Sequence, residues 1–213
     1  MLTPPVPRLH LIGPLGIVPQ ADYPALAARA VAGGADAIHV RLPGGAAREL
    51  LALARAVRAV CPGAQLLVND RLDLALLADA DGAQLGEASV SVADARQLLG
   101  PGALLGRSVH DVDGARQAAA DGADFLLAGH VFETSSKAGQ PGRGLAWLAE
   151  IALGVPTPVI ALGGLNVARI AEALAAGAWG VALGRELLTA NNPEATARQA
   201  RACVDRHVQQ GAV

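Results

Sequence analysis

Short, almost continuous apolar segments alternate along the chain with longer segments in which alanine and leucine recur at helical spacing. Strands that are buried on both faces have such continuous apolar sequences, and parallel sheets contain such strands. The predicted strands are residues 9–12, 37–41, 65–69, 83–85, 104–108, 125–128, 158–162 and 180–183. Helices are predicted between them, for example over residues 24–32, 46–60, 115–120, 167–176 and 193–210.

A short pattern rich in glycine, alanine and aspartate recurs along the chain, about two strand–helix units apart. Its copies are residues 33–38, 80–85, 121–126 and 176–181, and each follows an alanine-rich stretch and leads into an apolar run. Glycine ends a helix in a left-handed turn, and the next strand then starts almost at once. Each copy therefore marks the corner between a helix and the following strand.

Strict alternation of strand and helix predicts a parallel sheet with right-handed crossovers. Eight such units in 213 residues predict a closed (β/α)8 barrel, a TIM barrel at the small end of its size range. The competing fold is a doubly wound open sheet. No linker or low-complexity segment divides the chain, so residues 1–213 are expected to form one domain.

Composition narrows the class of protein and of partner. Hydrophobic residues make up 52% of the chain but aromatic residues only 2%, so the core must be packed from Ala, Leu, Val and Ile. The net charge of −2 is dispersed, without a basic block for nucleic acid or a membrane surface. No apolar run reaches the roughly 20 residues of a membrane span, and the N-terminus lacks a signal-peptide pattern. We expect a cytoplasmic protein with unpaired thiols at Cys61 and Cys203, and a homo-oligomer stays open.

Polar side chains gather where the predicted strands end. In such barrels the chemistry lies at the carboxyl ends of the strands. The residues at or near these ends are His10, His39, Arg41, Asn69, Asp70, Ser108, His110 and His130. Four of the five histidines are therefore expected at one end of the barrel, although each can instead be a hydrogen-bonded structural histidine.

The loop over residues 129–144, after the sixth predicted strand, contains several candidate catalytic and anion-binding residues. Lys137 is the only lysine of the chain, and it shares this glycine-rich loop with His130 and Thr134. A chain that otherwise uses arginine and places one compact ammonium here is expected to need it for an anion. The loop therefore predicts an anion-binding catalytic segment.

Glycine turns follow the last two predicted strands. Gly163 and Gly164 end the seventh strand, and Gly184 with Arg185 ends the eighth. Paired glycines let backbone N–H groups close around a phosphate, and the positive end of the following helix dipole adds to this. The loops after strands seven and eight are the recurrent phosphate site of this fold, so these residues are predicted to bind a phosphate.

Asp70 has two interpretations. It can stabilise the start of the helix that follows it, or it can help to hold a divalent cation. One carboxylate makes a poor Mg²⁺ site unless substrate phosphates contribute ligands. No histidine or cysteine cluster has zinc spacing, and no Ser-His-Asp triad is indicated.

On these residues the chain resembles the thiamine phosphate synthase superfamily of (β/α)8 barrels over nearly its whole length. The matching segments are residues 39–41, 68–71, 84–86, 106–110, 122–124, 129–144 and 160–164. Synthases usually read Gly-Pro-(Ile/Val)-Phe-x-Thr-x-(Ser/Thr)-Lys in the long loop, whereas this chain has His130 in place of the proline. That loop is similar to the TenI branch, the thiazole tautomerases, and the resemblance implies that His130 carries the proton.

Two departures from the synthase pattern point the same way. Synthases typically have Gln-x-Arg-x-Lys after strand two, where this chain reads His39, Arg41 and Pro43. They also carry an acidic metal ligand after strand four, where this chain has Ala88 and Ser89. The resemblance therefore implies that this chain binds a pyrimidine pyrophosphate with Mg²⁺ only weakly. If the chain were a synthase, Asp70 alone would be left to hold the Mg²⁺.

The expected function is therefore a thiazole tautomerase of thiamine biosynthesis, which aromatises a carboxythiazole phosphate without metal or redox cofactor. The predicted roles are proton transfer by His130, since imidazole titrates near neutral pH, and carboxylate binding by Arg41 or Lys137. Hydrogen bonds come from Asn69, Ser108 and Thr134, and phosphate binding from Gly163, Gly164, Gly184 and Arg185. The alternatives are a thiamine phosphate synthase, which joins hydroxymethylpyrimidine pyrophosphate to thiazole phosphate, a non-catalytic phosphate-ligand sensor, and another sugar-phosphate isomerase or epimerase.

Overall fold

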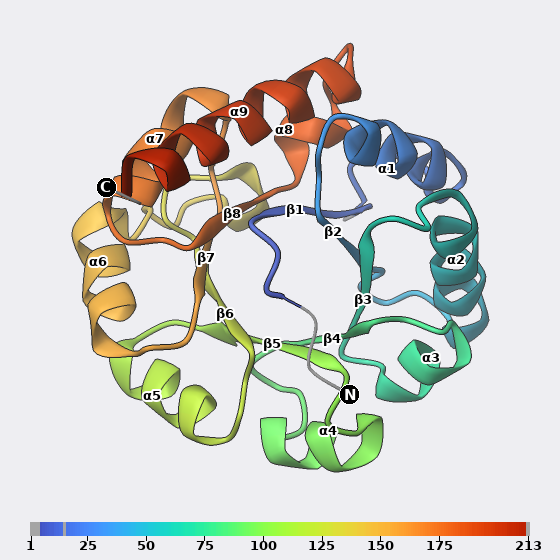
Figure 1. Ribbon diagram of the computed structural model, residues 1–213. Helices are drawn as coiled ribbons and strands as arrows, with labels where there is room; N and C mark the ends of the chain where they lie inside the picture. The colour runs from blue at the N-terminus through green and yellow to red at the C-terminus, as the bar shows by residue number, and fades with distance from the viewer. Residues whose placement is uncertain (1–4, 15, 212–213) are drawn as a thin grey trace.

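Eight parallel strands close into a barrel in sequence order in the computed structural model, which describes residues 5–14 and 16–211 (Figure 1). The prediction of a (β/α)8 barrel is confirmed, and the open sheet is excluded, because β8 pairs with β1. The strands are β1 Leu9–Pro14, β2 Ala37–Arg41, β3 Gln65–Asn69, β4 Gly82–Leu85, β5 Leu104–Val109, β6 Phe125–Gly129, β7 Val159–Leu162 and β8 Gly180–Leu183.

Helices form a ring around the strands (Figure 1). The α-helices are α1 Tyr23–Ala32, α2 Ala47–Val60, α3 Leu72–Leu77, α4 Val92–Leu99, α5 Val112–Ala120, α6 Gly144–Gly154, α7 Ile170–Ala175, α8 Arg185–Leu188 and α9 Pro193–Gly211. Short 3-10 helices are η1 Gln20–Asp22, η2 Ser135–Lys137 and η3 Val167–Arg169.

Capping side chains explain where two predicted helices differ from the observed ones. Helix α5 starts three residues earlier than predicted because the Asp111 side chain accepts a hydrogen bond from the Gly114 N–H, 2.7 Å away. The predicted helix over residues 167–176 is divided into η3 and α7. Asn166 caps η3 by accepting from the Arg169 N–H at 3.1 Å.

Alternation along the strands separates two apolar layers. Outward-facing strand residues pack against the helices, while the inner layer fills the barrel with Ile12, Ala37, Leu67, Leu104, Phe125, Leu127, Ile160 and Ala182. Gly106 makes room within this interior, because a Cβ there would lie 2.2 Å from both Gln84 Oε1 and the Phe125 ring. Continuous apolar strands are therefore required by burial on both faces.

Two histidines lie inside the barrel rather than at its mouth. His10 and His39 are fully buried, and His10 Nδ1 lies 2.8 Å from His39 Nε2. The expectation that four histidines gather at the carboxyl ends of the strands is therefore wrong. The inward direction of alternate strand residues places these two in the core, beside Phe125.

The hydrogen bonds around the buried pair fix its tautomers. The Pro7 carbonyl can only accept, so His10 Nε2 donates to it, at 3.1 Å. His10 Nδ1 then accepts from His39 Nε2–H, and His39 Nδ1 is left as a buried acceptor without a partner in the described part of the chain. Burial lowers the pKa of His10 to about 4, and burial, with His10 adding a smaller effect, lowers the pKa of His39 well below its ordinary value.

The recurring glycine–alanine–aspartate pattern has a structural cause at the amino ends of the strands. Each aspartate precedes one strand and accepts from the backbone of the strand before it. Asp36 accepts from Leu9 N–H at 3.0 Å, Asp81 from Leu66 N–H at 2.7 Å and Asp124 from Leu105 N–H at 2.7 Å. Each also pairs with an arginine of an outer helix: Arg201 of α9, Arg58 of α2 and Arg96 of α4 respectively. These aspartate clasps join β1 to β2, β3 to β4 and β5 to β6.

The fourth copy of the pattern carries Trp179 instead of aspartate. Its backbone N–H donates to the Val159 carbonyl at 2.7 Å, and its indole N–H donates to the Val6 carbonyl at 3.2 Å. The Arg8 guanidinium lies over the indole ring, 3.5 Å from its centre. The backbone of Trp179 therefore bonds to β7, and its aromatic side chain packs on the segment before β1, where the other copies use a carboxylate.

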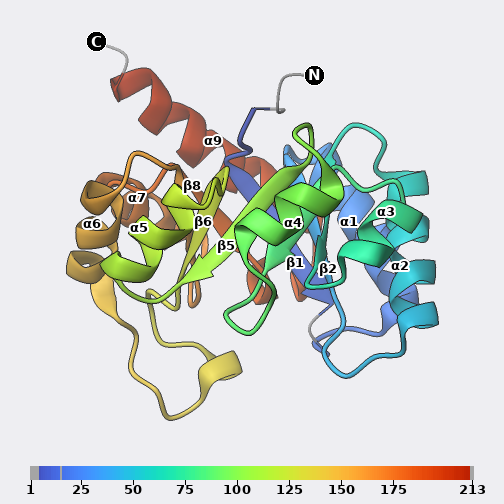
Figure 2. The ribbon, with the colours of Figure 1, turned by 90° about the horizontal axis from the view of Figure 1, so that it is seen from below.

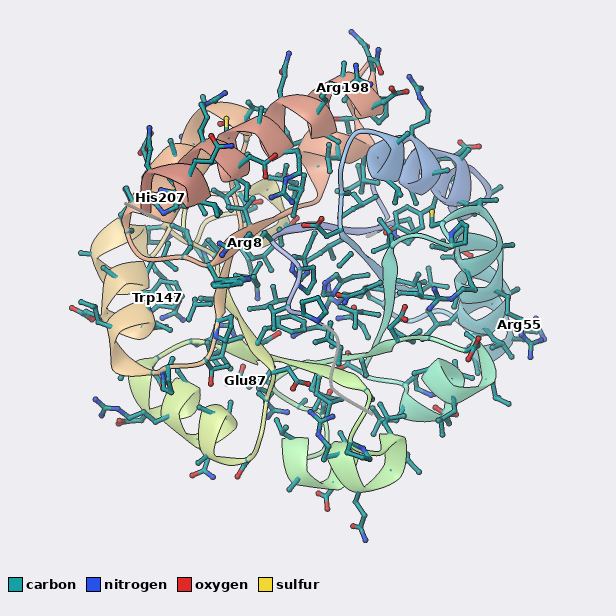
Figure 3. The ribbon with its side chains drawn as sticks, viewed as in Figure 1. Arg8, Arg55, Glu87, Trp147, Arg198 and His207 are labelled. Carbon is teal, nitrogen blue, oxygen red and sulfur yellow. The ribbon has the colours of Figure 1, made fainter. Side chains whose placement is uncertain are left out.

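The two ends of the barrel differ in shape. The loop over residues 129–144, yellow in Figure 2, projects beyond the strands on the side away from the chain ends. Charged side chains such as Arg55 and Arg198 point outward from the helical ring (Figure 3). In the part of the chain that the structure describes, no helix is long and apolar enough to cross a membrane. Cys61 and Cys203 are unpaired thiols, as predicted.

The buried histidine pair predicts a loss of stability in acid. An unfolded histidine has a pKa near 6.5, whereas both rings stay neutral in the fold, so the unfolded state binds more protons below about pH 6.5. The free energy of unfolding should fall as the pH drops from about 6.5 towards about 4, by at most ~1.4 kcal/mol per pH unit and histidine. Urea unfolding at several pH values measures it. A His10→Gln/His39→Gln double variant should have a flatter profile, whereas His207→Gln on α9 should keep the wild-type slope, and an equal slope in all three would contradict this explanation.

The aspartate clasps predict a second effect on stability. Asp124→Ala removes the acceptor of the Leu105 N–H and the partner of Arg96, so unfolding should become easier by about 1 to 3 kcal/mol. Asp113→Ala is the matched control, since that side chain is 95% exposed in its pair with Arg116, and it should cost about 0.5 kcal/mol or less. Equal midpoints of chemical unfolding for the two variants would refute the clasp.

Candidate active site

Loops from four different strands converge on one polar cavity at the carboxyl end of the barrel. The cavity has a volume of about 490 Å³ and is lined by Gly16, Ile17, Arg41, Pro43, Ser135, Ser136 and Arg185. These residues follow β1, β2, β6 and β8, so only barrel closure brings them together. The lining of this cavity, which we call the anion pocket, holds two guanidinium groups, two hydroxyl groups and no carboxylate.

The two arginines of the anion pocket have no internal partner. Among the described residues, only Arg41, Arg48 and Arg185 of the sixteen arginines have a guanidinium without a hydrogen bond or ion pair. Arg41 is the last residue of β2, and Arg185 begins α8, which follows β8. Both β2 and β8 pair with β1. Two unpaired cations in one cavity repel each other, so the arrangement is suited to a ligand with several negative charges.

The loop over residues 129–144 is held by its own backbone. His130 Nε2 lies 3.1 Å from the Pro141 carbonyl and 3.4 Å from the Gln140 carbonyl. The Arg143 N–H in turn donates to the His130 carbonyl at 3.1 Å. In this arrangement the His130 ring closes the loop on itself, and it does not line the anion pocket.

Thr134 and Lys137 belong to the same loop. Thr134 caps η2, and its hydroxyl oxygen accepts from the Ser136 N–H at 3.4 Å. Lys137 ends η2 with an exposed side chain that has no ion-pair partner in the described residues. The cap positions Ser135 and Ser136 towards the anion pocket, while Lys137 lies outside the lining.

The glycine turns pack against this loop. Gly163 has φ +96° and Gly164 φ +65°, and added Cβ atoms would lie 2.3 Å from His130 Cβ and 2.4 Å from the Glu133 carbonyl. Within the described residues, the N–H groups of Gly163, Gly164 and Gly184 have no hydrogen-bond partner. The turns therefore have donors to offer to a phosphate, although none of the three glycines lines the anion pocket.

Unpaired acceptors lie at the inner edge of the mouth. Asn69 Oδ1 and Gln84 Oε1 are buried without a donor within the described residues. Gln84 Nε2 donates to Ser108 Oγ at 3.1 Å, so Asn69 and Ser108, both predicted, stand beside a glutamine that the sequence interpretation did not select. The signal available in the sequence was a polar residue at an inward position of an apolar strand.

Asp70 does not cap a helix and is not part of the lining of the anion pocket. Helix α3 starts after Arg71 without a side-chain cap, so the capping interpretation is wrong. Asp70 Oδ1 instead accepts from the Gly86 N–H at 2.7 Å and from the Ser89 hydroxyl. The backbone conformation of Asp70, with φ +60°, turns its carboxylate towards the loop after β4.

Other ionisable groups at this end are dispersed. His110 Nδ1 donates to the Gly129 carbonyl at 3.0 Å, and His110 Nε2 lies 3.6 Å from Glu87 Oε2, on a side chain that is 80% exposed. Within the described residues, no three His, Cys, Asp or Glu side chains form a group that could hold a metal ion. Carboxylates at the mouth are therefore spread out rather than gathered around one point.

The structure thus brings together only part of the predicted site. Arg41 and Arg185 share the anion pocket, whereas its lining does not include Asn69, Ser108, Thr134, Lys137, His130 or the three glycines. Gly16, Ile17 and Pro43 were missed because no motif marks them. Ser135 and Ser136 lay within the loop that was singled out, and their hydroxyl groups were the available signal.

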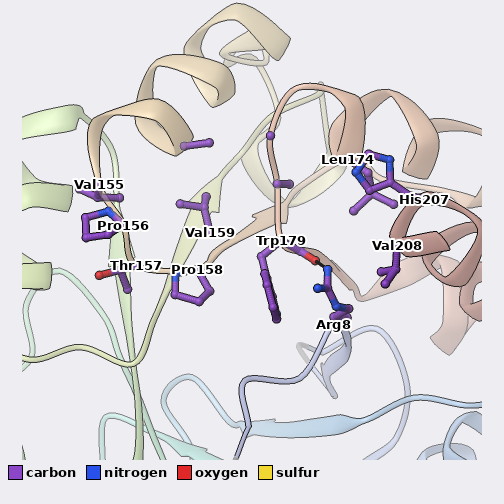
Figure 4. A pocket seen from close by; sticks show the side chains of 13 residues that line it. Arg8, Val155, Pro156, Thr157, Pro158, Val159, Leu174, Trp179, His207 and Val208 are labelled. Atoms are coloured by element: carbon purple, nitrogen blue, oxygen red, sulfur yellow. Dashed lines mark hydrogen bonds between the residues drawn. The ribbon is translucent and has the colours of Figure 1, made fainter. Parts of the chain in front are cut away.

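A second cavity lies at the opposite end of the barrel (Figure 4). Its volume is about 540 Å³, and Figure 4 shows Trp179 between Pro158 and Arg8 on its wall. The residues directly before β1, β7 and β8 are Arg8, Pro158 and Trp179. The amino ends of barrel strands serve stability rather than chemistry, which leaves the anion pocket as the candidate active site.

Comparison with known proteins identifies relatives over most of the chain. The family model described as thiamine monophosphate synthase matches residues 9–187. The thiamine-phosphate synthase of Anaeromyxobacter dehalogenans is 44% identical over 200 residues, which cover 93% of this chain and 90% of that protein. The thiamine-phosphate synthase of Methanoculleus marisnigri is 45% identical over 183 residues, covering 83% of this chain and 85% of that protein.

Solved structures agree with the sequence relatives. The thiamine phosphate pyrophosphorylase from Pyrococcus furiosus superposes with a TM-score of 0.85 at 30% identity, covering 94% of this chain and 96% of that one. A 3-hexulose-6-phosphate synthase superposes with a TM-score of 0.75 at 22% identity, which shows the shared fold alone.

These findings correct the expected function. The resemblance to the superfamily is confirmed, but the prediction of a thiazole tautomerase is wrong, since the relatives are named for the synthase that was the alternative. The tautomerase prediction depended on His130, whose ring has a structural explanation in its bonds to the Gln140 and Pro141 carbonyls. A loop histidine of this kind does not by itself indicate proton transfer.

The unpaired arginines predict anion binding that depends on two positions. Arg41→Gln and Arg185→Gln should each weaken the binding of inorganic pyrophosphate about tenfold or more, because each removes one charge from the anion pocket. Arg48→Gln is the matched control: this arginine is equally unpaired but lies on α2, outside the lining, and its loss should leave affinity unchanged. Calorimetric titration measures the three affinities. Equal losses in all three variants would contradict the assignment of the pocket.

Proposed function

Because the chain belongs to the thiamine monophosphate synthase family, we propose that it is a transferase that joins a hydroxymethylpyrimidine pyrophosphate to a thiazole phosphate. The chain is an enzyme of thiamine biosynthesis, and a small phosphorylated molecule is the substrate that its family indicates. The observation that supports the transferase assignment is the pair of unpaired guanidinium groups, Arg41 and Arg185, that share one cavity at the carboxyl end of the barrel.

The proposed reaction is a displacement at carbon. The bond between the exocyclic methylene carbon of the pyrimidine and the diphosphate oxygen breaks, and its electron pair leaves with pyrophosphate. A bond forms between that carbon and the ring nitrogen of the thiazole, which becomes a thiazolium. Negative charge therefore builds up on the leaving diphosphate, and cations fixed next to it stabilise the transition state.

Arg41 and Arg185 are proposed to bind the diphosphate. Their guanidinium groups are presented by β2 and α8 without competing carboxylates in the lining, so little reorganisation is needed when the leaving group gains charge. Ser135 and Ser136, positioned by the Thr134 cap, add hydroxyl donors from the opposite loop. Lys137, exposed on the same short helix, is proposed as a further contact for phosphate oxygens.

The thiazole phosphate is proposed to bind at the glycine turns. The N–H groups of Gly163, Gly164 and Gly184 have no partner in the described part of the chain, and such groups bind a phosphate without the side-chain entropy cost of an arginine. The two proposed phosphate sites adjoin each other at the end of β8, where Gly184 directly precedes Arg185. Holding both anions restricts the reacting nitrogen and carbon to one approach.

The pyrimidine is proposed to enter the inner edge of the mouth. Asn69 Oδ1 lacks a donor there, and an exocyclic amino group would supply one. Ser108, which accepts from Gln84 Nε2, has a hydroxyl proton of its own to donate to a ring nitrogen. His130 is proposed to stabilise the loop over residues 129–144 through its bonds to the Gln140 and Pro141 carbonyls.

The family resemblance also implies Mg²⁺, and the donor set does not fit a cation held by the protein. Asp70 is the carboxylate that the resemblance selects, and its Oδ1 already accepts two hydrogen bonds, from Gly86 and Ser89. Mg²⁺ requires six oxygen ligands in near-octahedral geometry, and the described residues offer no cluster of acidic or histidine side chains. The reaction described above therefore has no step that runs through a metal ion.

The transferase assignment predicts a defined product. Purified protein given hydroxymethylpyrimidine pyrophosphate and thiazole phosphate should release pyrophosphate and form thiamine phosphate in equal amounts, which chromatography and a pyrophosphate assay measure. Arg41→Gln should lower kcat/KM by about 10²-fold, since it removes a charge that acts on the leaving group. Arg48→Gln should keep the wild-type rate. Absence of both products under conditions where the protein is folded would exclude the proposed function.

A further inference from the structure

We propose that the anion pocket binds a diphosphate without a divalent cation held by the protein, because Asp70 Oδ1 already accepts hydrogen bonds and position 89 supplies no second carboxylate beside it. This inference rests on the proposed function for the identity of the ligand. It depends on three features of the mouth: the charge of the pocket, the hydrogen bonds of Asp70 and the side chain at position 89.

The charge of the anion pocket is already positive. Arg41 and Arg185 line it, neither is neutralised by a carboxylate in the described residues, and Ser135 and Ser136 contribute uncharged donors. Two arginines therefore do for a diphosphate what a bound cation does elsewhere: they neutralise oxygens that repel one another.

The hydrogen bonds of Asp70 compete directly with metal binding. Gly86 N–H lies 2.7 Å from Asp70 Oδ1 and 3.1 Å from Ser89 Oγ, and the Ser89 hydroxyl proton is donated to the same carboxylate oxygen. A cation at Oδ1 would displace both donors from this oxygen and leave the Gly86 N–H with only its longer contact to Ser89 Oγ. Only Asp70 Oδ2 is then available, and one oxygen atom is a weak anchor for an ion that loses its water reluctantly.

The side chain at position 89 determines whether the loop after β4 donates a hydrogen bond to Asp70 or binds a cation together with it. A serine donates its proton to Asp70 and tightens the loop after β4. A carboxylate in its place would have no proton to donate at neutral pH, and two carboxylates side by side would attract a divalent cation to relieve their repulsion. Ser89→Asp should therefore convert a metal-independent mouth into a metal-dependent one.

The test titrates inorganic pyrophosphate into the full-length protein by calorimetry, once with excess EDTA and once with Mg²⁺. Wild-type protein and Ser89→Ala should bind equally well or less well with Mg²⁺. For Ser89→Asp, Mg²⁺ should tighten binding about tenfold or more. Electron paramagnetic resonance of Mn²⁺ provides a readout without any ligand, and only Ser89→Asp should bind the ion. Tightening of wild-type binding by tenfold or more with Mg²⁺, or equal behaviour of the three proteins, would overturn the inference.

The outcome separates this inference from the proposed function. A protein that binds pyrophosphate in EDTA but forms no thiamine phosphate would refute the transferase assignment and keep the metal-independent pocket. A protein that forms thiamine phosphate, yet binds pyrophosphate only with Mg²⁺, would keep the transferase and refute the inference. Arg41→Gln, which should lose pyrophosphate binding in EDTA, verifies that the titrated site is the anion pocket.

Discussion

Closure of the parallel ladder is the constraint on which the rest of the structure depends. Once β8 pairs with β1, every strand has neighbours on both sides, and alternate side chains must point into a narrow interior or out beneath the helices. An inward side chain is removed from solvent whatever its polarity. The polar residues that do point inward, His10, His39 and Gln84, are therefore fully buried and bonded to one another or to nearby backbone and hydroxyl groups.

The two ends of the closed barrel differ in how their charged side chains are paired. At the amino ends, Asp36, Asp81 and Asp124 satisfy backbone N–H groups of neighbouring strands and bind arginines of the outer helices. Cations and anions are neutralised there in pairs. At the carboxyl ends, Arg41 and Arg185 have no partner among the residues that the structure describes. The electrostatic asymmetry, compensated at one end and open at the other, supports anion chemistry at the open end.

Which groups a ligand meets at the open end depends on which side chains there already have hydrogen-bond partners. Asp70 is engaged by Gly86 and Ser89, and His130 by carbonyls of its own loop, so neither is a free reactive group. The two arginines have no partner within residues 5–14 and 16–211. A ligand that enters the mouth therefore meets unpaired donors and cations rather than a preformed metal site. The relatives overturn the tautomerase prediction, and the His130 ring on which it depended contacts two carbonyls of its own loop.

The sequence by itself determined the fold and the family, since burial on both strand faces, glycine turns and strict alternation are written in local patterns. It also selected Arg41 and Arg185. It did not place His10 and His39 in the core, find the aspartate clasps or predict the Asp70–Ser89 contact, and it favoured a tautomerase from His130. Those outcomes depend on which strand ends meet after closure, because residues far apart in sequence become neighbours only then. Hydrogen-bond partners are set by that geometry, and one-dimensional spacing carries no record of it.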